Sequence, residues 1–216
     1  MDSHADESSA ALDAAAQDGL SALRAAASAR EWAVLQAELG GLLAGLPLFA
    51  ALSAVIDGLT ALLPVVEARE AYDMQLRGLP RQLLAGVMSY GFAPDQLPDQ
   101  IIADYHTPGA AQFMHAVLEL CRAAQRERDD AERPALLVSA AGNAIIAAMG
   151  ESFYARHPEL FARVRDNRLD PETGEYTDPD AAKIPILLWM DAEVAALDTA
   201  QWLALADRVE RAYANL

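Results

Sequence analysis

Few side chains in this sequence combine a reactive type with a suggestive spacing. His115 and Glu119 lie four residues apart in a stretch with helical apolar spacing, so they would share a helix face. Such a pair could orient an imidazole for proton transfer or hold a metal. Arg122 and Arg126 continue the same stripe, which favours a solvated polar face instead. Asn143 is the third catalytic candidate. A buried amide without a partner costs roughly 1–3 kcal/mol, so Asn143 either bonds to a neighbouring backbone or side-chain group or points into a polar pocket.

Motifs for metal or nucleotide chemistry are absent from the sequence. It contains no Cys-x-x-Cys, HExxH, Walker loop, GxGxxG or GxSxG, and no histidine follows a glutamate at the spacing of di-iron helices. Cys121 is the single cysteine, so an internal disulfide is excluded, and we expect a buried structural thiol. We therefore predict no cofactor and no metal site. A non-enzymatic role is favoured, and catalysis stays open.

The charge balance is strongly acidic. The net charge of −16 and pI near 4.5 repel nucleic-acid phosphates and anionic lipid heads. The densest group of arginines, within residues 122–133, is interleaved with acidic residues and offers no phosphate track. We predict no nucleic-acid partner. A basic protein partner fits the charge, although acidic proteins also use charge for solubility.

Composition favours helix. The chain is 53% hydrophobic but only 6% aromatic, and much of its apolar share is alanine, the best helix former. With Lys183 the only lysine, the arginine and alanine bias indicates a GC-rich, bacterial coding sequence. The acidic residues 1–8 resemble no secretion or transit signal. We predict a flexible tail over 1–8, a single helical domain over 9–216 and a cytoplasmic location.

Residues 40–66, GGLLAGLPLFAALSAVIDGLTALLPVV, carry one charge, Asp57. Glycines and Pro47 predict a break near 40–46, and Pro64 predicts the end of a helix over 47–63. Each piece is shorter than the ~20 residues of a spanning helix, and flanking basic residues are missing. We predict a buried core helix and no membrane span. A ligand or partner groove is the alternative.

A second uncharged run, PALLVSAAGNAIIAAMG, occupies residues 134–150. It is apolar on nearly all sides, as a central buried helix is, and its natural partner is the helix 47–63. The predicted fold is an all-α, orthogonal or irregular bundle of about eight to ten helices with two apolar central helices. An apolar pocket between those two helices, with Asp57 and Asn143 as polar contacts, would suit an enzyme or small-molecule carrier.

Capping patterns predict several helix starts. Ser28 with Glu31 resembles a capping box for a second helix, and Asp198 with Gln201 resembles one for the last helix. Thr107 is a candidate N-cap for the helix that contains His115.

The segment 166–185 is long, irregular and acidic. Its acids do not match an EF-hand, because counting back from Gly174 puts Leu169 at the first ligand position. A surface hairpin is one interpretation and a binding loop the other. Trp189 and Met190 follow it, and both residue types favour interface centres. The predicted partner-binding residues are Trp189, Met190, Asp170, Glu172, Glu175 and Asp178.

Two functions fit these patterns. The first is a cytosolic accessory factor of the chaperone-like, adaptor or inhibitor type, which binds a protein through its acidic surface and residues 166–190. The second is the helical enzyme or small-molecule carrier with the pocket between 47–63 and 134–150. The oligomeric state stays open.

Overall fold

The computed structural model describes residues 3–69, 78–90 and 109–216, and these ranges are all-α, as predicted. They form nine α-helices and one 3₁₀ turn, with no named strand. The elements are α1 (Ser3–Ala29), α2 (Trp32–Gly45), α3 (Leu48–Arg69), α4 (Leu79–Tyr90), α5 (Ala110–Ala123), α6 (Arg133–Arg156), α7 (Pro158–Asp166), η2 (Ala181–Lys183), α8 (Ile184–Met190) and α9 (Ala192–Ala214).

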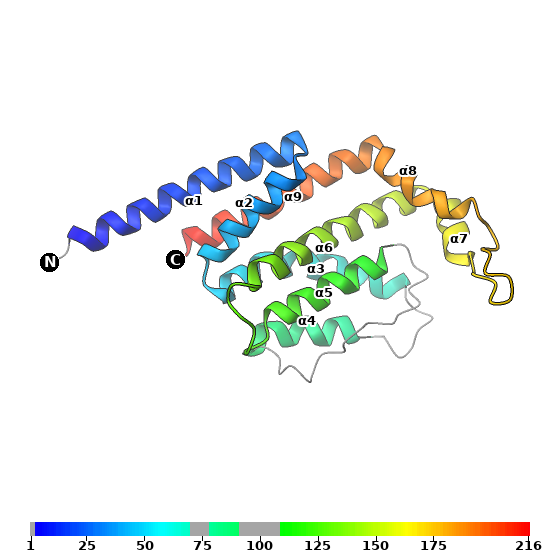
Figure 1. The fold of residues 1–216 in the computed structure, drawn as a ribbon, viewed down its shortest axis with the longest axis horizontal. Helices are drawn as coiled ribbons and strands as arrows, with labels where there is room; N and C mark the ends of the chain where they lie inside the picture. The colour runs from blue at the N-terminus through cyan, green and yellow to red at the C-terminus, as the bar shows by residue number, and fades with distance from the viewer. Residues whose placement is uncertain (1–2, 70–77, 91–108) are drawn as a thin grey trace.

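Helix α6 lies at the centre of an irregular bundle, in agreement with the prediction of an apolar central helix. It packs on α2, α3, α5 and α9 and reaches α7 and α8 near its end (Figure 1). Most of its side chains are buried, because small residues on several faces let neighbouring helices approach. The second apolar helix, α3, does contact α6, but the most extensive neighbour of α6 is α5.

Helix α3 is longer than predicted. It continues through Pro64 to Arg69, so the predicted end at residue 63 was wrong. Pro64 removes one backbone hydrogen bond, but Leu63 and Val66 on either side are buried, and their packing holds the helix together. With this length, α3 and α6 are the two described helices long and apolar enough to cross a membrane; core helices of soluble proteins meet the same criteria.

The predicted break near residues 40–46 is also displaced. Helix α2 runs through Gly40 and Gly41 and ends at Gly45. Gly45 leaves room for a contact with α9, because a Cβ there would collide with the hydroxyl of Tyr213 unless that side chain shifts. That hydroxyl donates a hydrogen bond of 2.6 Å to the carbonyl of Leu42 and ties α9 to α2.

The two predicted capping boxes are wrong. Ser28 belongs to α1, where its hydroxyl donates to the carbonyl of Arg24, and Glu31 precedes α2 without a side-chain cap. Asp198 lies inside α9, whose N-cap is Asp191. Asp191 Oδ1 accepts hydrogen bonds of 2.9 Å from the amides of Glu193 and Val194. The predicted cap at Thr107 lies outside the described residues.

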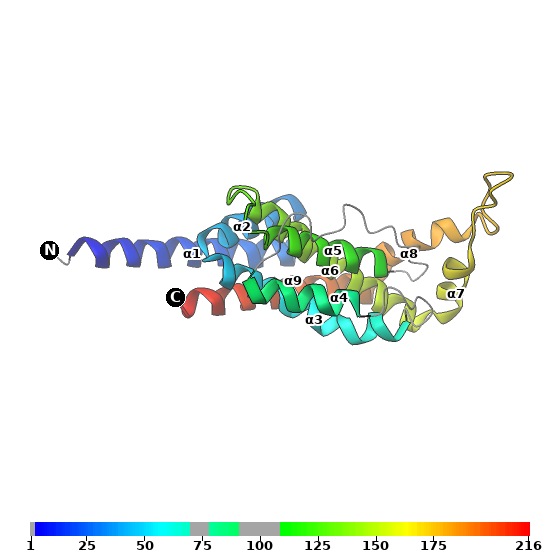
Figure 2. The ribbon, with the colours of Figure 1, turned by 90° about the horizontal axis from the view of Figure 1, so that it is seen from below.

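The molecule is elongated (Figure 2). The start of α1 and the end of α9 lie at one end, and α7, α8 and the segment between them lie at the other (Figure 1). Helix α1 begins at Ser3, so most of the segment predicted as a tail is helical. The chain thus presents two separate ends, each with its own surface chemistry.

Candidate functional site

Helix α8 exposes most of its apolar side chains. Its inward residues, Ile184 and Leu188, are one turn apart and buried. The remaining large apolar side chains point outward and are 46–77% exposed. We call these four residues the α8 surface: Ile186, Leu187, Trp189 and Met190. Exposed large apolar side chains that gather on one short helix are typical of an interaction site.

The segment before α8 folds into a hairpin, as one of the two interpretations predicted. Leu169 and Tyr176 pair as an antiparallel bridge. The amide of Asp170 donates to the carbonyl of Glu175, and the amide of Thr177 donates to the carbonyl of Arg168, both at 2.8 Å. Leu169 and Tyr176 are themselves about half exposed. The hairpin, residues 167–178, therefore projects apolar as well as acidic side chains.

The tip of the hairpin is organised by Asp170. Its Oδ1 accepts hydrogen bonds from the amides of Glu172 at 2.8 Å and Thr173 at 3.4 Å. These bonds lower the pKa of Asp170, because they stabilise the carboxylate. Gly174 closes the turn with φ +70 and donates its amide to the carbonyl of Asp170 at 2.8 Å. The tip is thus preorganised by its own side chains.

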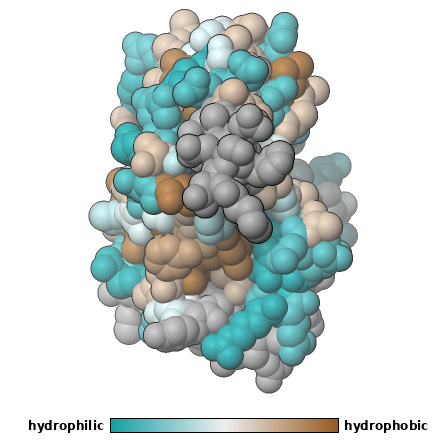
Figure 3. Space-filling view, turned by 90° about the vertical axis from the view of Figure 1, so that its left-hand side faces the viewer, coloured by the Kyte–Doolittle hydropathy of each residue, from teal (hydrophilic) through white to brown (hydrophobic). Residues whose placement is uncertain are grey.

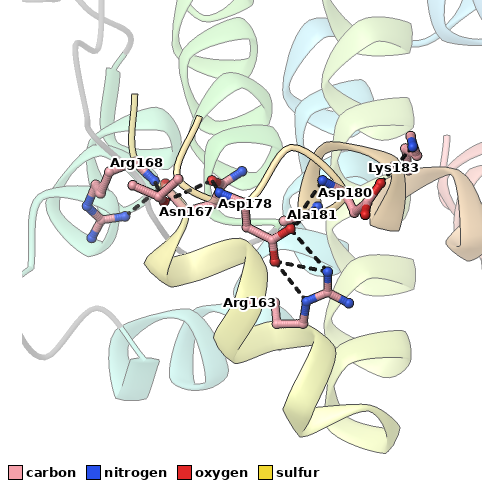
Figure 4. Close-up of polar contacts among 8 residues, drawn as sticks. Arg163, Asn167, Arg168, Asp178, Asp180, Ala181 and Lys183 are labelled. Carbon is pink, nitrogen blue, oxygen red and sulfur yellow. Dashed lines mark hydrogen bonds and ion pairs between the residues drawn. The ribbon is translucent and has the colours of Figure 1, made fainter. Parts of the chain in front are cut away.

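The base of the hairpin is held by Asp178 (Figure 4). Arg163 of α7 donates to both of its carboxylate oxygens, at 2.9 Å and 3.2 Å, and this ion pair lowers the pKa of Asp178. Asp178 Oδ1 also accepts from the amides of Asp180 and Ala181 at the start of η2. Asn167 accepts from the amide of Asp178 at 2.9 Å. One carboxylate thereby connects α7, the hairpin and η2.

These contacts divide the predicted partner-binding acids into two kinds. The carboxylates of Asp170 and Asp178 are occupied in building the hairpin. Glu172 and Glu175 are exposed acidic side chains. The outward negative charge of the hairpin tip is therefore carried by Glu172 and Glu175.

A groove of about 290 Å³ runs beside the α8 surface. It is lined by the start of α5 at Ala111 and Gln112, by α6 at Ile146 and Gly150, and by side chains of α7 and α8. Trp189 lines this groove and is also half exposed, so one indole belongs to both features. The groove is lined mainly by apolar and small residues, which suits an apolar side chain from a partner.

His115 and Glu119 lie one turn apart on α5, and Asn143 lies on the neighbouring helix α6. His115 is exposed on α5, whereas Glu119 forms an ion pair of 3.0 Å with Arg122. Asn143 donates to the carbonyl of Ser139 one turn earlier, at 3.1 Å, so its amide is engaged within its own helix. Within the described ranges, no three His, Cys, Asp or Glu side chains form a group that could hold a metal.

Cys121 has the environment of a structural thiol. It is fully buried in α5, and burial raises its pKa to about 12. The thiolate needed for nucleophilic chemistry is therefore disfavoured at neutral pH.

The predicted pocket between the two apolar helices corresponds to a hollow of about 110 Å³ between α3, α6 and α9. Of the two residues proposed as its polar contacts, Asp57 lines this hollow and Asn143 does not. Arg208 of α9 also lines it, and no sequence pattern indicates this residue because only the packing of α9 brings it there. Likewise, the outward direction of Ile186 and Leu187 could not be predicted from an apolar run.

Searches against protein-family models, curated proteins and solved structures each find no match for this chain.

Proposed function

We propose that this chain is a cytoplasmic protein-interaction factor that binds a partner protein through the α8 surface and the hairpin. The observation that carries the proposal is the exposure of Ile186, Leu187, Trp189 and Met190 on one helix of seven residues. Leaving these side chains in water forgoes the burial energy of roughly 1.5–3 kcal/mol that each would contribute. A partner that covers them would recover it.

The geometry supports a partner segment with an apolar anchor. Met190 is 77% exposed and Trp189 faces the groove over α6. Trp and Met are enriched at interface centres, and a desolvated Trp commonly contributes several kcal/mol to binding. An apolar side chain of the partner would enter the groove beside Trp189.

The charge at this end supports a basic flank on that partner segment. Glu172 and Glu175 are exposed at the hairpin tip, and the whole chain carries −16. Opposite charge raises association rates and selects partners more than it raises affinity. The proposed partner segment is therefore amphipathic, with apolar anchors beside lysine or arginine.

Site-specific photo-crosslinking tests this proposal. A photoreactive amino acid replaces Met190 in the full chain, expressed at native level in its own cells, and a matched protein carries it at Val34, which is 43% exposed on α2. We expect one discrete crosslinked partner from position 190 and none from position 34. Equal products from both positions, or no product from position 190, would contradict the proposal.

The partner identified in this way then allows a quantitative test. Trp189→Ala should weaken its binding at least tenfold, because truncating a central aromatic typically costs more than about 1.4 kcal/mol. Changing Glu172 and Glu175 together to glutamine should reduce the salt dependence of binding and leave the apolar contribution intact. Val34→Asp should leave the dissociation constant unchanged. Salt-insensitive binding would remove the electrostatic part of the proposal.

A further inference from the structure

Two arginines near the C-terminal end of α9 form no ion pair within the described ranges, unlike most of the other arginines described. In a chain with 16 excess acidic charges, nine described arginines have a carboxylate within 4.0 Å: Arg24, Arg30, Arg81, Arg122, Arg128, Arg133, Arg156, Arg163 and Arg165. Within the described ranges, Arg208 and Arg211 have none. They lie nearly one turn apart on α9 and line the same hollow.

Arg208 is a partly buried cation. Its Nε donates a hydrogen bond of 2.9 Å to the carbonyl of Ala54 on α3. Burial lowers its pKa, Asp57 opposes this change, and the positive charge of Arg211 adds to it. A Cβ at Gly58 would lie 3.3 Å from Arg208 Nη2, so the glycine lets the guanidinium lie close against α3. The helices thus hold a desolvated positive charge beside a second one.

Two hollows meet at this arginine. The inner hollow of about 110 Å³ has apolar walls from α6, including Ala141, Ala144 and Ile145. The outer hollow of about 380 Å³ lies between the start of α3 and the end of α9 and is lined by Ser53, Arg211 and Asn215 among others. Asp57 and Arg208 line both hollows.

The end of the molecule seen in Figure 3 carries a hydrophobic area among hydrophilic residues. Phe49, at the start of α3, lines the outer hollow and is 63% exposed. A ligand that enters here passes apolar surface before it reaches the arginines. The site is therefore amphipathic, with charge at the junction of two partly apolar hollows.

We propose that these hollows bind a small organic monocarboxylate whose short apolar tail fills the inner hollow and whose carboxylate lies against Arg208 and Arg211. Guanidinium groups bind carboxylates through paired N–H donors, and the hydroxyl of Ser53, which lines the outer hollow, supplies a further donor. Two arginines and Asp57 leave one net positive charge, which matches a monoanion. Asp57 disfavours phosphate and other multiply charged anions.

The inner volume sets the length of the tail. It is smaller than the cavity of about 150 Å³ that accepts benzene in another protein, so it holds a tail of roughly four or five carbons. Each buried methylene should tighten binding about fourfold until the hollow is full. This inference is independent of the proposed protein partner, whose surface lies at the opposite end (Figure 1).

Titration of the full chain with a series of straight-chain carboxylates, followed by calorimetry, tests the proposal. We expect saturable one-to-one binding of hexanoate, weaker binding of butyrate and acetate, and no comparable binding of hexylamine. Palmitate should not bind more tightly than hexanoate. Tighter palmitate binding would indicate a lipid site and overturn the short-tail assignment. Inorganic phosphate that binds as well as hexanoate would overturn the role of the apolar hollow.

Substitutions assign the site. Arg211→Gln changes an exposed residue, and it should weaken hexanoate binding at least tenfold. Gly58→Ala should also weaken binding, because its methyl group pushes Arg208 Nη2 away. Arg168→Gln is the matched control, since the guanidinium of this arginine bonds to backbone carbonyls near the hairpin, and it should have no effect. Hexanoate binding that is absent, or unchanged in Arg211→Gln, would overturn the proposal.

Discussion

The indole Nε1 of Trp202 donates a hydrogen bond of 3.1 Å to the carboxylate of Asp198, one turn earlier in α9. Asp198 is 1% exposed, and within the described ranges its Oδ2 has no hydrogen bond, with Arg30 at 3.8 Å. Burial raises the pKa of Asp198 above its ordinary value of 3.8, and the charge of Arg30 and the bond from Trp202 oppose the rise. Burial is the larger effect.

This pKa shift predicts how stability depends on pH. The folded chain holds the proton on Asp198 more tightly than the unfolded chain, so its contribution is most favourable below pH 3.8. That contribution is lost as the pH rises through the folded-state pKa. Asp198→Asn should therefore raise the free energy of unfolding at pH 7 by about 1 kcal/mol, because a neutral amide avoids the buried charge.

Urea denaturation of both proteins between pH 4 and 8 measures this difference, which should shrink toward pH 4. Trp202→Phe supplies the second half of a double-mutant cycle: it should destabilise the native chain more than it destabilises the Asp198→Asn variant. If Asp198→Asn is less stable than the native chain at pH 7, the attraction of Arg30 outweighs burial and the prediction is wrong.

A second prediction concerns the glycines of α2. Gly45→Ala should destabilise the chain by about 2 kcal/mol, because the new methyl group displaces the Tyr213 hydroxyl from the carbonyl of Leu42. Gly41→Ala is the control: nothing lies within 4 Å of a Cβ there, so it should stabilise the helix by up to about 1 kcal/mol. Equilibrium unfolding in urea compares the two.

A Tyr213→Phe background tests whether the cost of Gly45→Ala comes from the Tyr213 hydroxyl. In a Tyr213→Phe background the hydroxyl is gone, so Gly45→Ala should cost much less than in the native chain. An equal cost in both backgrounds would mean that the glycine serves α2 itself and not the contact with α9.

A third prediction concerns the start of α9. Arg156 donates to both carboxylate oxygens of Asp191, at 3.0 Å and 3.1 Å, and this bond with the two capping amides lowers the pKa of Asp191 to about 2. The folded pKa lies below the ordinary 3.8, so the stabilisation is fully present above that value. It is lost as the pH falls through about 2.

Asp191→Ala should therefore lower the midpoint of thermal unfolding at pH 7, and the difference from the native chain should fade between pH 4 and 2. Asp191→Asn separates the two roles, since asparagine keeps the helix cap and loses the ion pair. Its midpoint should lie between the other two. A difference that persists unchanged at pH 2 would assign the effect to something other than the ionised carboxylate.

A fourth prediction concerns the hairpin tip. Asp170→Ala removes the acceptor of the Glu172 and Thr173 amides, so both amides should exchange with deuterium faster. The midpoint of global unfolding should stay the same, because the tip is exposed. Glu172→Ala is the control and should leave the exchange rates unchanged. Slow exchange in Asp170→Ala would show that the bridge of Leu169 with Tyr176 is enough to order the turn.

The sequence predicted the features that depend on local periodicity. Alanine and leucine at helical spacing predicted an all-α chain, and the uncharged runs predicted the apolar helices α3 and α6. The bond from Asn143 to the carbonyl of Ser139 is also local, since the two residues are one turn apart on the same helix; the sequence left open whether Asn143 bonds to a neighbour or faces a pocket. The exposed acidic hairpin followed from turn-forming residues between two helices. In each case the deciding interaction lies within a few residues of chain.

Only the tertiary structure decided the rest. Whether Pro64 ends a helix depends on the packing of Leu63 and Val66. Asp198 does not cap α9 because the helix begins earlier, at Asp191, whose carboxylate also accepts hydrogen bonds from Arg156. The contact of Arg208 with Ala54 joins residues 154 positions apart, and the outward face of α8 exists because only Ile184 and Leu188 reach the core. These outcomes depend on which helices lie side by side, and apolar packing between distant segments leaves no periodic trace in the sequence.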